Sequence, residues 1–243
     1  MEADAEKKLR GFGPRAERTS DTGDSYSGDA WQRDSHCDEM AQGSSMARSM
    51  IPVLETERLL LRPLELEDAE QVQKIFPHWE IVKYLNSWVP WPYPADGAHT
   101  YYRDVALPAM ERGEEWHWPL RLKSDASRVP GVIGMITLMK RADHNRGFWV
   151  GLPWQGQGLA SEACEVVTDY WFDELKFPVL RVPKAAANAA SRRISEKQGM
   201  RMVGTVEGDY VSGRLPSEIW EITAEEWREQ KRRSGRGRKD GTG

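Results

Sequence analysis

The segment 147–163 constrains the fold of this chain more than any other part of its sequence. An apolar run predicts a strand over 146–152, and apolar residues at helical spacing predict a helix over 159–175. The first turn of such a helix presents unpaired backbone N–H groups at the positive end of the helix dipole. Between the two elements, Gly156 and Gly158 remove side chains where a pyrophosphate would approach the backbone. The segment therefore predicts an anion site between a strand and a helix.

Two common phosphate-binding loops fit this segment poorly. A P-loop needs Gly-Lys-Ser/Thr, and no lysine occurs between Arg141 and Lys176. A dinucleotide fingerprint needs an acidic residue at the end of the next parallel strand, and the strand predicted over 179–184 ends without one. A Walker-type NTPase and a dinucleotide-binding domain are therefore disfavoured, and a plain flexible loop stays as the alternative to an anion site.

A different pattern fits better. Gln155, Gly158 and Ala160 fill the pattern Gln/Arg-x-x-Gly-x-Gly/Ala, which resembles the acetyl-CoA signature of the GNAT N-acetyltransferases. Two more blocks, Glu-Arg-Leu-Leu-Leu-Arg-Pro with Glu-Asp-Ala over 57–69 and Asn-Ala-Ala-Ser to Gly-Met over 188–200, resemble the ribosomal-protein (RimJ/RimL-type) N-terminal acetyltransferase branch. Because the three blocks follow the family's order, the chain is identified as resembling this branch.

The resemblance implies an α/β GNAT fold, with a mixed, mostly antiparallel sheet of about seven strands, helices on both faces and a splayed strand pair at the CoA site. Periodicity predicts strands over 58–63, 116–123, 131–139, 146–152, 179–184, 200–207 and 216–222, and helices over 67–76, 97–112, 159–175 and 189–198. Thr223 and Glu226 form a capping box for a last helix, and residues 212–214 read as a hairpin tip. Pro183 lacks a ladder N–H, so it belongs at the splay or at a sheet edge.

Composition divides the chain into three parts. Residues 1–50 are polar and poor in aliphatic side chains, which predicts a disordered extension before an acetyltransferase domain over 51–229. A basic, glycine-rich tail over 230–243 is expected to be disordered, either touching RNA phosphates or merely solvated. The net charge of −4 gives no case for nucleic-acid binding by the whole protein.

Cysteine content and hydropathy indicate where the protein works. Two cysteines, no signal peptide and no membrane-length apolar run predict a soluble, cytoplasmic protein. Nothing in the sequence marks a self-complementary surface, so the oligomeric state stays open.

The resemblance implies acetyl-CoA as co-substrate, without a metal. Its contacts are expected at Val150, Gly151, Leu152, Gln155, Gly156, Gln157, Gly158, Leu159, Ala160, Ser161, Asn188 and Ser191. A backbone N–H near Val150 to Leu152 would hold the oxyanion, as is usual in this family. Asn188 either hydrogen-bonds the pantetheine arm or caps a helix. Ser191 would reach the CoA sulfur, where its hydroxyl can stabilise or protonate the thiolate.

Other catalytic residues are sought near the end of the strand over 200–207. Asp209 and Tyr210 are candidates for activating the amine, and the alternative for each is a solvated turn residue. Glu218, on the returning strand, is a further candidate, and it points into the cleft or out of it depending on the strand register. His117 is a candidate for the acceptor site, and the alternative is a histidine with a structural role. Trp91 is a second candidate, and the alternative is that its loop only fills space in the packing.

The expected reaction is direct acetyl transfer to a primary amine in a ternary complex. A protein α-amine is the first expectation for the acceptor, because its pKa of about 7.7–8.0 makes little demand on a base. A small-molecule amine is the alternative. A different class of protein, a non-catalytic acyl-CoA-binding or ribosome-associated module, would bind CoA without turnover.

Overall fold

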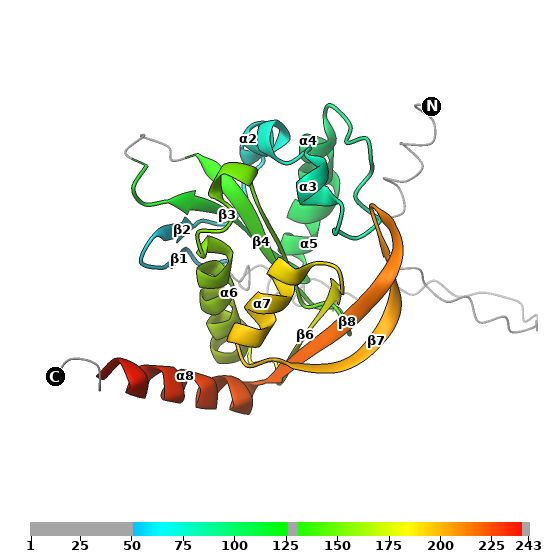
Figure 1. Cartoon of the computed structure of the whole chain (residues 1–243). Coiled ribbons are helices and arrows are strands. Elements are labelled where there is room, and N and C mark those ends of the chain that lie inside the picture. Colours follow the sequence, from blue (N-terminus) through cyan, green and yellow to red (C-terminus); the bar gives the residue numbers. More distant parts are fainter. Residues whose placement is uncertain (1–50, 126–130, 240–243) are drawn as a thin grey trace, which may run out of the picture.

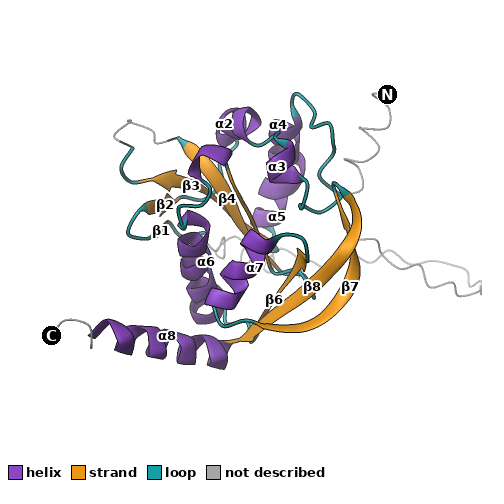
Figure 2. Ribbon diagram, viewed as in Figure 1, coloured by secondary structure: helices purple, strands orange, loops and turns teal. Residues whose placement is uncertain are grey.

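The computed structural model describes residues 51–125 and 131–239, and these form two antiparallel sheets covered by helices (Figure 1, Figure 2). The larger sheet has the order β1-β2-β3-β4-β5. Its strands are β1 (Leu54–Glu55), β2 (Leu59–Leu61), β3 (Glu115–Leu122), β4 (Val132–Met139) and β5 (Arg146–Val150). The smaller sheet has the order β6-β8-β7, with β6 (Val179–Ala185), β7 (Arg201–Tyr210) and β8 (Gly213–Thr223).

The helices occupy three places around these sheets. One group lies at one end of the molecule and consists of α2 (Asp68–Ile75), α3 (Trp79–Val82), α4 (Gly97–Tyr101), the π-helical turn η1 (Tyr102–Ala106) and α5 (Leu107–Glu111). A short 3-10 turn, η2 (Leu152–Trp154), leads to α6 (Leu159–Asp169), which ends in the π-helical turn η3 (Tyr170–Glu174). Helices α6 and α7 (Ala189–Lys197) lie beside each other, and α8 (Ala224–Lys239) runs along the opposite end (Figure 1).

The main core forms where α6 packs on the larger sheet, and buried side chains of the smaller sheet join it. Helical spacing brings Ala163 and Val167 of α6 and Trp171 of η3 onto one buried face, as the sequence predicts. Trp171 stacks on Phe177 with ring centroids 4.1 Å apart, and its indole N–H donates to the Val179 carbonyl at 2.9 Å. This packing fixes the helix whose first turn follows the glycine loop.

The two sheets meet at a single backbone contact and then separate. The N–H of Asn145 donates to the Arg181 carbonyl at 2.8 Å, and the N–H of Arg181 donates to Asn145 Oδ1 at 2.7 Å. Within the described residues, β5 and β6 do not pair with each other beyond this contact, because β5 pairs only with β4 and β6 only with β8. Since backbone groups alternate sides along a strand, Pro183 faces the gap as Arg181 does, and its missing N–H removes no ladder bond. The expected splayed pair is therefore confirmed.

Most predicted elements are present at their predicted places, and the capping box is formed. The N–H of Glu226 donates to Thr223 Oγ1 at 3.2 Å, and the N–H of Thr223 donates to Glu226 Oε2 at 2.9 Å. The sheet differs from expectation because it is divided into two, and every strand pair in the described residues is antiparallel. The short elements β1 and α3 were not predicted, because two to four residues carry too little periodicity.

Two details near the C-terminus also differ from the prediction. The hairpin turn consists of residues 211–212, one position earlier than expected, because Tyr210 pairs with Gly213. Helix α8 continues to Lys239, where a disordered tail was expected from residue 230. Lys231 explains part of this, since its ammonium contacts Glu165 and Asp169 of α6 at 2.9 and 3.0 Å. The predicted extension over residues 1–50 lies outside the described residues.

A buried ion pair joins α2 to the central strand β3. Arg121 is 1% exposed and donates to the carboxylate of Asp68, which is 5% exposed. The pKa of Asp68 is raised, because burial outweighs the opposing effect of Arg121. The pair therefore holds the first helix of the end group against the larger sheet.

Removing one partner of this pair is predicted to be costly. Asp68→Ala leaves the Arg121 cation buried without its carboxylate and should lower the free energy of unfolding by about 3–5 kcal/mol. Urea unfolding measures this loss. The control is Glu70→Ala, which removes an exposed pair with Lys74 on the same helix and should leave the midpoint unchanged. Equal midpoints for the two variants would contradict the assignment.

Candidate active site

A cavity of about 790 Å³ runs through the space where the two sheets separate. At one end it is lined by the glycine loop and α7, and at the other by aromatic residues of 84–102 and by the end of β7. The cavity therefore joins the predicted anion site to the predicted acceptor region.

The glycine loop has the backbone that the sequence predicts. Gly156 and Gly158 have φ of 74° and 81°, a region that other residues rarely adopt. An added Cβ on Gly156 would meet no atom within 4 Å, so the loop leaves open space in front of α6. Arg58 holds the loop from behind by donating to the Gln157 carbonyl at 3.0 Å and pairing with Glu162 of α6 at 2.6 Å. A pyrophosphate fits this arrangement, since N–H groups of a helix start are exposed beside an open loop.

The strand β5 presents one backbone edge to the cavity. Gly151 donates its N–H to the Ile133 carbonyl of β4 at 2.8 Å, so this donor is already used. By alternation the backbone of Val150 faces away from β4, toward the gap between the sheets. Its carbonyl there accepts a hydrogen bond from Gln155 Nε2 at 2.8 Å. Of the predicted oxyanion donors, the N–H of Val150 is thus the one directed toward the cavity.

Helix α7 begins beside the same gap. Asn188 caps it by accepting the Ser191 N–H with Oδ1 at 3.1 Å, so the capping alternative holds, and Asn188 also lines the cavity. The Ser191 hydroxyl oxygen accepts a hydrogen bond from Lys184 Nζ at 2.8 Å. Burial, helped by the nearby Arg146 cation, lowers the pKa of Lys184 to about 7.

At the acceptor end, His117 is held by two partners. Its Nε2 lies 2.8 Å from Glu115 Oε2, and its Nδ1 lies 3.0 Å from Thr137 Oγ1. Glu115 also pairs with Arg141 at 2.6 Å. Burial acts most strongly on Glu115 and raises its pKa, but His117 and Arg141 together hold the pKa below its usual value. His117 therefore lines the cavity in a fixed orientation, and its part in acceptor binding stays a prediction.

The predicted base candidates lie in different places. Asp209 is exposed and lines the cavity, and Tyr210 also lines it and donates its hydroxyl to Ser217 Oγ at 2.6 Å. Burial, opposed by the Ser217 hydrogen bond, raises the pKa of Tyr210. Glu218 does not line the cavity, because it pairs with Arg192 at 2.9 Å and accepts the Trp220 indole N–H at 3.0 Å. The structure thus brings Asp209 and Tyr210 to the cavity and engages Glu218 elsewhere.

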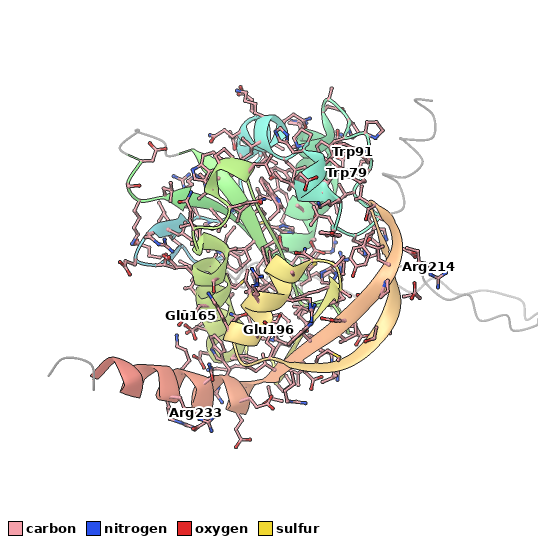
Figure 3. The ribbon with its side chains drawn as sticks, in the orientation of Figure 1. Trp79, Trp91, Glu165, Glu196, Arg214 and Arg233 are labelled. Atoms are coloured by element: carbon pink, nitrogen blue, oxygen red, sulfur yellow. The ribbon has the colours of Figure 1, made fainter. Side chains whose placement is uncertain are left out.

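Trp91 lies outside the main cavity. It lines a neighbouring cavity of about 390 Å³, and its ring lies 5.6 Å from that of Trp79. Figure 3 shows the two tryptophans close together at the end of the molecule opposite Arg233. Tyr210 lines both cavities, so the smaller one adjoins the acceptor end.

The remaining predicted cofactor residues divide into two groups. Those that line the main cavity with Val150, Asn188 and Ser191 are Gln155, Gly156, Gly158, Leu159, Ala160 and Ser161. Gly151, Leu152 and Gln157 do not line it. Leu152 lies on the exposed turn η2, and the side-chain N–H of Gln157 donates to the Pro153 carbonyl at 3.0 Å.

Sequence reasoning missed several basic residues of the cavity, among them Lys184, Arg193 and Lys197. Arg193 and Lys197 are exposed and line it from α7, where their i, i+4 spacing is a sequence signal for one helical face. Both can attract phosphate groups. Lys184 has no comparable local signal, because its burial depends on how β6 packs against α6 and α7.

Comparisons with known proteins agree with this geometry. Residues 58–201 match the family model described as "Acetyltransferase (GNAT) domain". A curated relative is "Putative ribosomal N-acetyltransferase YdaF" of Bacillus subtilis (strain 168), which is 25% identical over 181 residues, covering 72% of this chain and 96% of that protein.

Two solved structures share the fold. One is the ribosomal-protein-S5-alanine acetyltransferase from Vibrio fischeri, with a TM-score of 0.61 and 12% identity, covering 72% of this chain and 98% of that one. The other is RimL, a ribosomal L7/L12 alpha-N-protein acetyltransferase in complex with coenzyme A, with a TM-score of 0.58 and 14% identity, covering 71% and 97% of the two chains.

The fold and the cavity define an acyltransferase that uses acetyl-CoA. Since the family model covers more than half of its length, the chain belongs to the GNAT acetyltransferase family. Within the described residues, no three His, Cys, Asp or Glu side chains are grouped to hold a metal ion, and no helix is long and apolar enough to cross a membrane.

The phosphate site gives a direct prediction. Gly156→Glu places a carboxylate in the open space of the loop and should weaken CoA binding on the order of tenfold or more, about 1.4 kcal/mol. Isothermal titration with CoA measures the change. The control is Gly113→Glu, since Gly113 has a similar φ of 65° and open surroundings but does not line the cavity. If both variants bind CoA equally, the pyrophosphate does not lie at this loop.

Proposed function

We propose that this GNAT enzyme acetylates the α-amine of a protein N-terminus, by direct transfer in a ternary complex. The observation that carries the proposal is the single cavity that extends from the glycine loop to an exposed carboxylate, Asp209, at the acceptor end. The name of the relative YdaF, a putative ribosomal N-acetyltransferase, supports a ribosomal-protein type of acceptor.

The chemistry required of the acceptor end is modest. An α-amine has a pKa of about 7.7–8.0, so a substantial fraction is neutral near pH 7.5 without a strong base. Asp209 attracts the ammonium form and can receive its proton through water. Tyr210 beside it donates its hydroxyl proton to Ser217, so its oxygen can accept an N–H from the amine. These two residues would bind and orient the amine.

The transfer itself uses groups on β5 and α7. The N–H of Val150 would stabilise negative charge on the thioester oxygen, since it belongs to a fixed strand and needs no reorganisation. Ser191 would donate its hydroxyl proton toward the sulfur that leaves. The acetyl-CoA substrate would be held by Gly156, Gly158 and the start of α6, with Arg193 and Lys197 near its phosphates.

The acceptor class is tested by thiol release from acetyl-CoA with a panel of acceptors. The panel contains peptides with N-termini of ribosomal-protein type, the same peptides with blocked α-amines, free amino acids and polyamines. The proposal predicts turnover with the unblocked peptides and none with the blocked ones. Turnover restricted to free amino acids or polyamines would assign a small-molecule acceptor. CoA binding without any turnover would support a non-catalytic module.

Ser191 provides the second test. Ser191→Ala is predicted to lower kcat on the order of a hundredfold, while KM for acetyl-CoA changes little, because the hydroxyl acts on the leaving sulfur. The matched control is Ser195→Ala, which removes a fully buried hydroxyl one turn further along α7, away from the cavity. If Ser191→Ala is no slower than Ser195→Ala, the role given to Ser191 is wrong.

A further inference from the structure

We propose that Lys184 is the proton donor behind Ser191: its ammonium donates to the hydroxyl oxygen, and through that hydroxyl a proton passes to the sulfur of departing coenzyme A. This inference rests on the role proposed for Ser191 and not on the identity of the acceptor. Lys184 acts through another residue, so it is a positioning and proton-supplying residue.

The geometry around Ser191 supports this assignment. Lys184 Nζ lies 2.8 Å from Ser191 Oγ and 5.4 Å from the ring centre of Phe148 on β5. All three residues line the cavity. The ammonium form of Lys184 has only donors, so in that form the serine oxygen accepts and the hydroxyl hydrogen must point elsewhere. The lysine therefore turns the Ser191 hydroxyl into a donor toward the cavity.

Each element packed around Lys184 contributes a charged or titratable group. His144 before β5, Arg146 of β5 and Cys164 of α6 interact with it electrostatically. On β8 its register partner is Glu218, which is already paired with Arg192 of α7 at 2.9 Å. The group closest to the lysine is thus a hydroxyl.

A second buried cation increases the positive charge of this region. Arg146 is 3% exposed and donates to neutral partners, Thr168 Oγ1 at 2.6 Å and Gln198 Oε1 at 2.8 Å. Over 51–125 and 131–233, no carboxylate lies within ion-pairing distance of Arg146 or of Lys184, which is 6% exposed. Two buried basic groups without an anion are costly, and an incoming thiolate would relieve that cost.

The protonation state of Lys184 suits a donor. Burial first, and then Arg146, lower its pKa to about 7, so both the charged and the neutral form are populated near neutrality. The ammonium can give up its proton to Ser191 and recover one from water. A lysine with an ordinary pKa of about 10.4 would donate a proton much less readily.

The proton and bond balance closes without another reactant. The neutral amine forms the C–N bond, the C–S bond breaks, and the amine's extra proton leaves to water near Asp209. The sulfur takes the Ser191 hydroxyl proton, and the Ser191 oxygen takes one from Lys184. Lys184 is then protonated again from water, so an amine and a thioester give an amide and a thiol.

The kinetic test compares Lys184→Met with Lys184→Arg. Lys184→Met should lower kcat on the order of tenfold to a hundredfold, with KM for acetyl-CoA little changed. In the wild type kcat should fall as pH rises above the pKa of Lys184, since the protonated form is needed. This decrease of kcat with pH should be absent in both variants, because neither side chain titrates in this range. Lys184→Arg should keep part of the rate, because it keeps a cation beside Ser191. Lys74→Met, which changes an exposed lysine of α2, is the control.

The double variant Ser191→Ala/Lys184→Met separates this inference from the proposed function. It should be no slower than Ser191→Ala alone, because the lysine acts through the hydroxyl. A slow Ser191→Ala with a normal Lys184→Met would overturn only the role of Lys184. A normal Ser191→Ala would overturn both roles. Any acceptor that the enzyme uses serves for these measurements.

A second measurement needs no acceptor. Bound CoA titrated by its thiolate absorbance should ionise in part at the pH where Lys184 loses its proton, below the range of free CoA, because the thiol and the lysine then share one proton. Lys184→Met should reduce this shift. The CoA affinity and the thermal midpoint of the variant are measured as controls, to show that it is folded and has CoA bound. Identical titrations of the two proteins would overturn the proposal.

Discussion

The site depends on the separation of β5 from β6. Asn145 and Arg181 hold the two strands together at one end, and beyond them each strand keeps a partner on its outer side only. An unpaired strand edge is normally covered or charged. Here the two facing edges border a cavity, and Pro183 stands at the point where an N–H would have no strand partner. The fold thus produces a ligand site by leaving backbone positions unpaired.

The distribution of charge in the cavity complements this backbone arrangement. The buried ammonium of Lys184, on which the Arg146 cation acts, lies beside Ser191, whereas the exposed carboxylate Asp209 lies near the acceptor end. A leaving thiolate is an anion and an incoming amine is a cation before it loses its proton, so the two ends suit the two charges. At the acceptor end His117 and Arg141 line the cavity, and Glu115 holds both of them in place.

Local signals were sufficient for the parts of the site that one segment builds. The glycine loop, the start of α6 and the cap at Asn188 follow from neighbouring residues, and the structure has them as predicted. Strand register could not be predicted, because a shift of one residue moves a side chain to the other face. For this reason Glu218 was a candidate and is instead engaged by Arg192. Lys184 was missed because its environment comes from three separate elements.

The most direct test of this account is hydrogen–deuterium exchange of the whole chain with and without CoA. Ligand contacts with backbone N–H groups slow their exchange. The account predicts that CoA protects amides of the glycine loop, the first turn of α6, the exposed edge of β5 and the start of α7, and leaves β1 and α8 unchanged. Protection confined to other segments, or no protection at saturating CoA, would contradict the claim that the gap between β5 and β6 is the acetyl-CoA site.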